Sequence, residues 1–166
     1  MNPGIVEART GSADETQALA GAVAALAERG DIIVLAGDLG TGKTVWVKGF
    51  AAALGVMEPV TSPTFTLVRP YEGTRLRLLH ADVYRLDRLR EVSDLDLVEQ
   101  LDDRAVACIE WGDLAVPALP ADFLEVRLEQ GEADAERTVT FRPVGARWHA
   151  RMGELRARVG SWVVGT

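Results

Sequence analysis

The chain has 166 residues, 48% of them hydrophobic, which suits one compact domain with a buried core. Its formal net charge of −7 argues against a protein that binds nucleic acid through bulk positive charge. A single cysteine excludes an internal disulfide framework, and no apolar run approaches the roughly 20 residues that span a bilayer. Because the start lacks a basic and then apolar signal segment, we expect a cytoplasmic protein. The sequence shows no linker or repeat, and we expect a single domain over residues 1–166.

The first third of the chain alternates strand and helix patterns. Residues 5–9 predict a short strand, and Ser12 then stands where a capping box with Glu15 would open a helix that ends at Gly30. Residues 31–36 form a continuous apolar run, which is typical of a strand buried on both faces. A glycine-rich turn follows, and then a helix is expected over residues 43–54.

The remaining elements include two predicted hairpins and a second continuous apolar run. The expected segments are strands 64–71 and 76–82, a helix over 94–101, the buried strand 105–109, strands 123–128 and 138–142, and a C-terminal helix with Trp148, Met152, Leu155 and Val159 on one side. The order predicts an α/β fold, which the motif at residues 37–44, described next, narrows to that of the P-loop NTPases. It would have a mainly parallel central sheet, added antiparallel strands and helices on both faces.

Residues 37–44 read GDLGTGKT and match the phosphate-loop pattern GxxxxGK[ST] in full. They follow a predicted buried strand and precede a helix, which is the context that the pattern requires. Glycines let successive backbone N–H groups turn around a phosphate, Lys43 can reach the β- and γ-phosphates, and the Thr44 hydroxyl can bind Mg²⁺. The nucleotide contacts are assigned to Asp38, Leu39, Gly40, Thr41, Gly42, Lys43, Thr44 and Val45.

The nucleotide is expected to be ATP. Guanine-specific relatives usually read the base with an Asn-Lys-x-Asp loop, and the only lysines of this chain are Lys43 and Lys48. That loop is therefore absent from the sequence. Lys48, one helical turn beyond the motif, is interpreted as a surface residue.

Two acids end predicted strands and are candidates for the metal and for hydrolysis. Glu110 ends the buried run and is assigned to Mg²⁺ together with Thr44, while Asp82 could orient water, hold the metal through water, or cap a turn. Ser62 and Thr64 precede a strand where a switch segment would sense the γ-phosphate, although a plain proline turn is the alternative. The catalytic residues are predicted to be Lys43, Asp82 and Glu110.

Other polar and aromatic residues receive structural interpretations. His80 is expected to be a packed strand residue rather than a base, and Trp111 a core residue or one that packs against the switch. Five arginines near the C-terminus are interpreted as a solvated helix face, with a partner-contact role left open: Arg142, Arg147, Arg151, Arg156 and Arg158.

Four motifs in order resemble the TsaE family of bacterial P-loop ATPases. They are GDLGTGKT at 37–44, SPTFTLV at 62–68, HADVYRL at 80–86 and Glu-Trp at 110–111. The resemblance implies that Lys43 and Thr44 serve phosphate and Mg²⁺, Glu110 the metal, Thr64 the switch, and Asp82 hydrolysis. Val45, Phe65 and Gly112 depart from residues common in the family, which leaves rate and packing open.

The resemblance also implies a role in making tRNA threonylcarbamoyladenosine. TsaE proteins act with a TsaB–TsaD pair, in which TsaD transfers the group to adenosine 37, and ATP hydrolysis resets the machinery. Because no residue stands out as an arginine finger in cis, we expect an ATPase that is slow alone and that the partners stimulate. The net charge of −7 argues against direct nucleic-acid binding, so the chain would meet tRNA only through the complex, and no membrane binding is expected. The alternatives are a small-molecule P-loop kinase and a nucleotide-dependent switch that does not hydrolyse.

Overall fold

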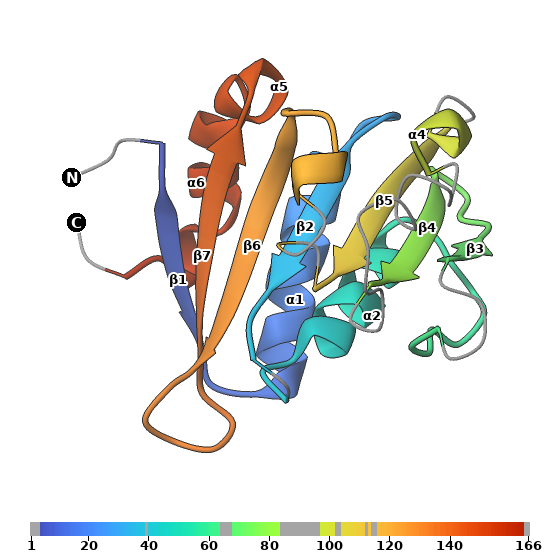
Figure 1. Ribbon diagram of the computed structural model, residues 1–166. Helices are drawn as coiled ribbons and strands as arrows, with labels where there is room; N and C mark the ends of the chain where they lie inside the picture. The colour runs from blue at the N-terminus through green and yellow to red at the C-terminus, as the bar shows by residue number, and fades with distance from the viewer. Residues whose placement is uncertain are drawn as a thin grey trace.

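The computed structural model describes residues 4–38, 40–63, 68–83, 97–101, 104–111, 113 and 116–164. In these parts of the chain, seven strands form one mixed sheet in the order β1-β7-β6-β2-β5-β4-β3 (Figure 1). The strands are β1 Val6–Thr10, β2 Ile32–Ala36, β3 Val68–Tyr71, β4 Arg77–Asp82, β5 Ala105–Glu110, β6 Phe123–Gln130 and β7 Arg137–Val144. The chain therefore carries the predicted α/β architecture.

The centre of the sheet is parallel and its two sides are antiparallel. Strands β6, β2, β5 and β4 run parallel to one another, whereas the pairs β6–β7, β7–β1 and β3–β4 are antiparallel. Every residue of β2 and β5 is buried, because helices or loops cover both of their faces. The two continuous apolar runs thus mark the strands that the site is built on, and both predicted hairpins are confirmed.

Helices cover the two faces unequally. The long helices α1 Ala13–Ala24 and α2 Lys43–Ala53 pack on one face together with α5 Ala146–His149 and α6 Met152–Arg158 (Figure 1). A second core on the other face includes Leu101, directly after α4 Leu97–Gln100, and Val116 of η2 Val116–Ala118. A last short helix, η3 Gly160–Trp162, precedes the end of the described chain. Helical segments therefore lie on both faces, with the larger core under α1 and α2.

The first helix starts as predicted but ends earlier. The Ser12 hydroxyl accepts the amide of Glu15 at 3.1 Å, which confirms the N-cap. The α-helix ends at Ala24, although the sequence pattern places its stop at Gly30, which has a φ of 86°. Beyond this point the Ala27 amide bonds the Ala24 carbonyl in a tighter turn, and the Glu28 amide donates to the Asp31 carboxylate instead of continuing the helix. The Arg75 guanidinium donates to the carbonyls of Ala24 and Ala27 at this helix end.

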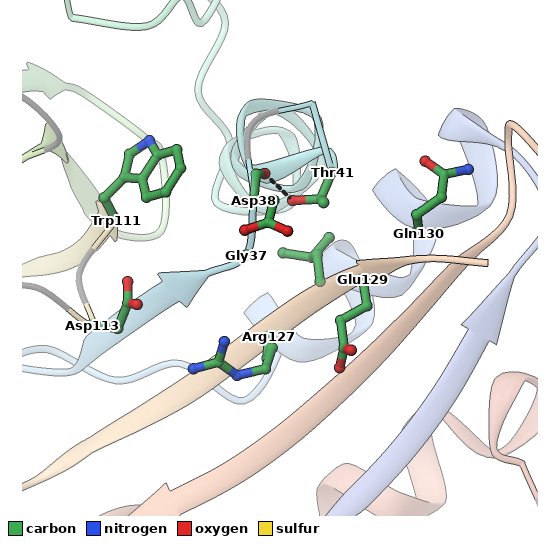
Figure 2. Close-up of a pocket in the computed structure, with 9 residues that line it drawn as sticks. Gly37, Asp38, Thr41, Trp111, Asp113, Arg127, Glu129 and Gln130 are labelled. Atoms are coloured by element: carbon green, nitrogen blue, oxygen red, sulfur yellow. Dashed lines mark hydrogen bonds between the residues drawn. The ribbon is translucent and has the colours of Figure 1, made fainter.

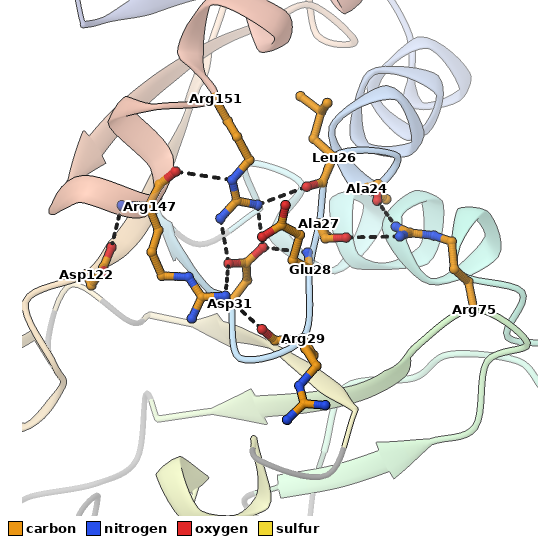
Figure 3. Close-up of polar contacts among 10 residues, drawn as sticks. All are labelled: Ala24, Leu26, Ala27, Glu28, Arg29, Asp31, Arg75, Asp122, Arg147 and Arg151. Atoms are coloured by element: carbon orange, nitrogen blue, oxygen red, sulfur yellow. Dashed lines mark hydrogen bonds and ion pairs between the residues drawn. The ribbon is translucent and has the colours of Figure 1, made fainter.

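Asp31 anchors the C-terminal helices beside the end of α1 (Figure 3). Its carboxylate accepts Arg151 Nη1 at 2.6 Å, Arg151 Nη2 at 2.7 Å and the Glu28 amide at 2.7 Å, and Arg147 Nη2 lies 3.2 Å away. The guanidinium of Arg151 also stacks on Trp148, 4.0 Å from the ring centroid. The interpretation of the C-terminal arginines as a solvated face is therefore wrong for Arg151, whose side chain is only 12% exposed.

The predicted C-terminal helix is divided into α5 and α6. Its four apolar residues at helical spacing are nevertheless all buried, namely Trp148, Met152, Leu155 and Val159. Arg142 also departs from the expected helix face, because it lies on β7 and donates to Glu125 at 2.7 Å. Within the described ranges, no helix combines the length and the apolar character that a membrane span needs.

Candidate functional site

The phosphate-loop motif connects the carboxyl end of β2 to the amino end of α2, as predicted. Its glycines have backbone conformations that other residues rarely adopt, with φ of 140° at Gly37, 81° at Gly40 and 101° at Gly42. At Gly37 a Cβ would also lie 2.4 Å from the Leu128 carbonyl oxygen, so only glycine fits against β6. The motif residue Leu39 lies outside the described residues. These glycines allow the tight turn that a phosphate cradle requires.

Lys43 is buried at the start of α2, and its ammonium points back into the loop. Its Nζ donates to the carbonyl oxygens of Gly37 and Asp38, each at 2.8 Å, and lies 3.9 Å from the centroid of the Trp111 ring. Burial lowers the pKa of Lys43, and the negative charge of Glu110 partly offsets this effect. The lysine is thus held within the loop by two carbonyl oxygens and an aromatic face.

Thr44 and Glu110 meet across the gap between α2 and the end of β5. Thr44 Oγ1 lies 2.9 Å from Glu110 Oε1 and 3.0 Å from Oε2, and it also lies 2.9 Å from the Ser62 hydroxyl. Glu110 is only 4% exposed although it is a carboxylate. The structure therefore brings together the two residues assigned to Mg²⁺ and one of the two assigned to the switch. The other switch residue, Thr64, lies outside the described residues.

His80 has a role that the sequence interpretation missed. Its Nε2 lies 2.5 Å from Glu110 Oε2, and its side chain is fully buried. His80 is packed within a strand, as expected, but it has a partner that the sequence did not reveal. Asp82, two residues further along β4, pairs in register with Glu110, so the two acids leave the same edge of the sheet on the same face. Asp82 is therefore placed beside the Thr44–Glu110 pair.

Trp111 follows Glu110 in a strained conformation. Its φ of 60° places a bulky residue in the left-handed region, which costs free energy that the surrounding structure must supply. The ring packs against the second core and also covers the ammonium of Lys43. The expected core role of Trp111 is therefore accompanied by a direct contact with the phosphate loop.

A cleft of about 520 Å³ opens beside the loop (Figure 2). In Figure 2, Asp38 and Thr41 of the loop face the carboxyl end of β6, and Trp111 and Asp113 close the opposite side. Thr41 donates its hydroxyl to the Asp38 carbonyl at 2.8 Å. The cleft lies where parallel strands end on either side of β2, which is the usual place for a ligand in an α/β sheet.

The comparisons with known proteins agree with the geometry. A family model described as threonylcarbamoyl adenosine biosynthesis protein TsaE matches residues 10–139. This chain belongs to the TsaE family. It is 42% identical over 147 residues to a Bacillus subtilis protein named tRNA threonylcarbamoyladenosine biosynthesis protein TsaE, covering 89% of this chain and 91% of the relative.

Other relatives and a solved structure extend the match. A Treponema pallidum protein of the same name is 42% identical over 129 residues, covering 78% of this chain and 94% of the relative. A crystal structure of Bacillus subtilis YdiB superimposes with a TM-score of 0.78 at 36% identity, covering 92% of this chain and 95% of that one. The family resemblance of the four motifs and the fold class are thus confirmed.

The structure of this TsaE family member places one further residue, from outside the four motifs, against the phosphate loop. Arg137, the first residue of β7, donates to the carbonyl oxygens of Gly40 and Thr41 in the phosphate loop. Asp38 faces solvent and contributes its backbone carbonyl, while Val45 is partly buried in the first turn of α2. Nothing local in the sequence distinguishes Arg137, because its contact spans 96 and 97 residues of chain.

Proposed function

We propose that the chain binds ATP with Mg²⁺ at its phosphate loop, hydrolyses ATP to ADP and phosphate, and acts in tRNA threonylcarbamoyladenosine biosynthesis. The observation that carries the proposal is the convergence of Lys43, Thr44 and Glu110 at the carboxyl ends of β2 and β5. Membership of the TsaE family supports the pathway, because the matching family model and the curated relatives bear its name.

The residues present fit a magnesium ion that is bound together with a nucleotide. Mg²⁺ prefers hard oxygen ligands and usually takes only one or two from the protein, the rest coming from phosphates and water. Thr44 and Glu110 offer a hydroxyl and a buried carboxylate that already face each other. In the described part of the chain, no three or more His, Cys, Asp and Glu side chains are grouped to hold a metal ion by themselves. Thr44 and Glu110 would hold the ion, with Asp82 beside them.

Catalysis would consist of positioning and electrostatic stabilisation by this chain's groups. Lys43 would exchange its two carbonyl partners for phosphate oxygens and neutralise charge on the β- and γ-phosphates. The N–H groups of the loop would orient the same phosphates, and Asp82 would orient water for attack. When bound, Mg²⁺ supplies positive charge that polarises the phosphoryl group.

The partners follow from the family and are part of the proposal. We propose that the chain works alongside a TsaB–TsaD pair and does not transfer the threonylcarbamoyl group itself. Its turnover alone would be slow, and the partners would stimulate it. Contact with tRNA would be indirect, since a net charge of −7 disfavours binding to a polyanion.

The two lysines of the chain provide a matched test. Lys43 is buried in the loop, whereas Lys48 is exposed on the same helix one turn further on. Lys43→Ala is expected to weaken Mg·ATP binding in calorimetry about 10- to 150-fold, because a hydrogen bond to a charged group contributes about 1.5–3 kcal/mol. Lys48→Ala should bind as the wild type does. Equal affinities of the two variants would contradict the phosphate site.

Phosphate release distinguishes the proposed hydrolysis from its alternatives. We expect slow release by the protein alone and faster release with TsaB, TsaD and tRNA. If ATP binds but no phosphate is released with the full set of partners, the chain is a switch that does not hydrolyse. Phosphate recovered on a small molecule from a metabolite panel would instead identify a kinase.

A further inference from the structure

Arg137 joins the phosphate loop to the turn between β6 and β7. Its Nε donates to the Thr41 carbonyl at 3.0 Å and its Nη2 to the Gly40 carbonyl at 3.3 Å. Its Nη1 donates to the carbonyls of Asp134 at 2.5 Å and Glu136 at 2.8 Å. The turn leaves the sheet at the end where β2 enters the phosphate loop (Figure 1). One planar guanidinium therefore holds two segments that lie far apart in the sequence.

These contacts fix the orientation of two peptide planes in the loop. A trans peptide directs its C=O and the following N–H to opposite sides. Because Arg137 holds the carbonyls of Gly40 and Thr41, the N–H groups of Thr41 and Gly42 face away from β7. The Thr41 N–H indeed donates to the Asp38 carbonyl at 3.3 Å, the same oxygen that accepts Lys43 Nζ at 2.8 Å. In the free protein the Thr41 N–H and the Lys43 ammonium therefore share one acceptor, the Asp38 carbonyl, and both would exchange it for a phosphate oxygen when a nucleotide binds.

The glycines make this restraint necessary. Gly40 and Gly42 flank Thr41 with φ of 81° and 101°, and glycine passes between such conformations with little resistance. A loop that can rotate its peptide planes would have to order them when a phosphate binds, at a cost in affinity. A partner that holds the carbonyls in the free protein removes part of that cost.

We propose that Arg137 is a positioning residue, which presents the N–H groups of Thr41 and Gly42 to the phosphates of the nucleotide and couples the β6–β7 turn to the site. The inference rests on the proposed nucleotide site. It concerns geometry rather than charge, because a guanidinium fork can engage several carbonyls in one plane, whereas an ammonium acts as a point charge. The charge-conserving variant Arg137→Lys should therefore fail to replace the arginine.

The test compares substitutions on one strand. Arg137→Lys keeps the charge, Arg137→Gln removes it, and Arg142→Gln is the control, because Arg142 lies on the same strand, pairs with Glu125 and has a side chain that is 48% exposed. Mg·ADP affinity is measured by calorimetry. Thermal unfolding without nucleotide shows that each variant is folded, and amide NMR shifts of residues 40–42 report the loop.

We expect both Arg137 variants to lose roughly tenfold in Mg·ADP affinity, as when an outer partner of an ion site is removed, and the control to lose none. The amide signals of residues 40–42 should shift in the free Arg137 variants. If Arg137→Lys binds as the wild type does, charge and not geometry is responsible, and the inference is overturned. The inference is overturned also if both Arg137 variants bind Mg·ADP with the affinity of the wild type. In that case the proposed nucleotide site stands, and only the role of Arg137 is refuted. If the wild type does not bind Mg·ADP, the proposed function fails and this inference fails with it.

Discussion

Replacing Asp31 by alanine is expected to destabilise the fold by about 3–5 kcal/mol, the usual cost of removing one partner of a buried ion pair. The Asp31 side chain is 0% exposed, and the Arg151 side chain facing it is 12% exposed. Burial by itself lowers the pKa of Arg151, but the hydrogen bonds and charge of Asp31 more than reverse that effect. Without Asp31 the buried guanidinium would keep the carbonyls of Leu26 and Arg147 but lose its bidentate, oppositely charged partner (Figure 3).

Urea unfolding followed by circular dichroism measures this loss. The control is Glu58→Ala, which removes a pair with Arg69 whose side chains are 48% and 41% exposed and should cost no more than about 1 kcal/mol. Adding Arg151→Met to Asp31→Ala should recover part of the stability, because no buried charge is then left unpaired. If Asp31→Ala destabilises the protein no more than Glu58→Ala does, the Asp31–Arg151 pair does not stabilise the fold.

Three further substitutions or reactions test the site and the core. Glu110→Gln should raise the Mg²⁺ concentration that gives half-maximal turnover roughly tenfold or more, and it should leave the affinity for nucleotide without metal nearly unchanged. If the turnover and its Mg²⁺ dependence do not change, Glu110 does not hold the metal. Gly49→Ala should lower the urea midpoint, since its Cβ would lie 2.2 Å from the Gln17 carbonyl oxygen of α1, whereas Gly153→Ala, with open space around it, should hold or raise the midpoint. Cys108 is buried and burial raises the pKa of its thiol, so iodoacetamide should alkylate Cys108 only when urea unfolds the protein. Because the thiol loses its proton more readily in the unfolded chain than in the folded one, the free energy of unfolding should fall as pH rises above the pKa of the unfolded thiol. Rapid alkylation of the native protein would contradict the buried placement of Cys108.

Much of the site was predictable because its signals are local in the chain. The glycines and Lys43 of the phosphate loop lie within one motif between a buried strand and a helix, and the continuous apolar run before Glu110 marks a central parallel strand. The proximity of Thr44 and Glu110 was also predictable. The phosphate loop and Glu110 stand at the carboxyl ends of two parallel strands, and such ends meet at one edge of a sheet.

The residues that sequence analysis missed depend on register and on distant pairing. His80 reaches Glu110 only because β4 and β5 are aligned so that Asp82 lies opposite Glu110, and no pattern within either strand specifies that alignment. Arg137 lies 97 residues after Gly40 in the sequence, and it reaches the loop only because β7 pairs with β6 in the sheet. The solvated interpretation of Arg151 was wrong because Asp31, a distant acid, provides a buried partner.

The sheet order also dictates when a nascent chain can complete its architecture. Strand β1 is made first, yet its sheet neighbour β7 is made last, with Val6 opposite Phe141 and Thr10 opposite Arg137. During synthesis β1 must wait without that neighbour until the final hairpin leaves the ribosome, and contacts of such long range slow folding. Arg137 arrives with the same hairpin. The polypeptide can therefore form its glycine-rich turn early but acquires the outer restraint on that turn only when assembly of the sheet is finished.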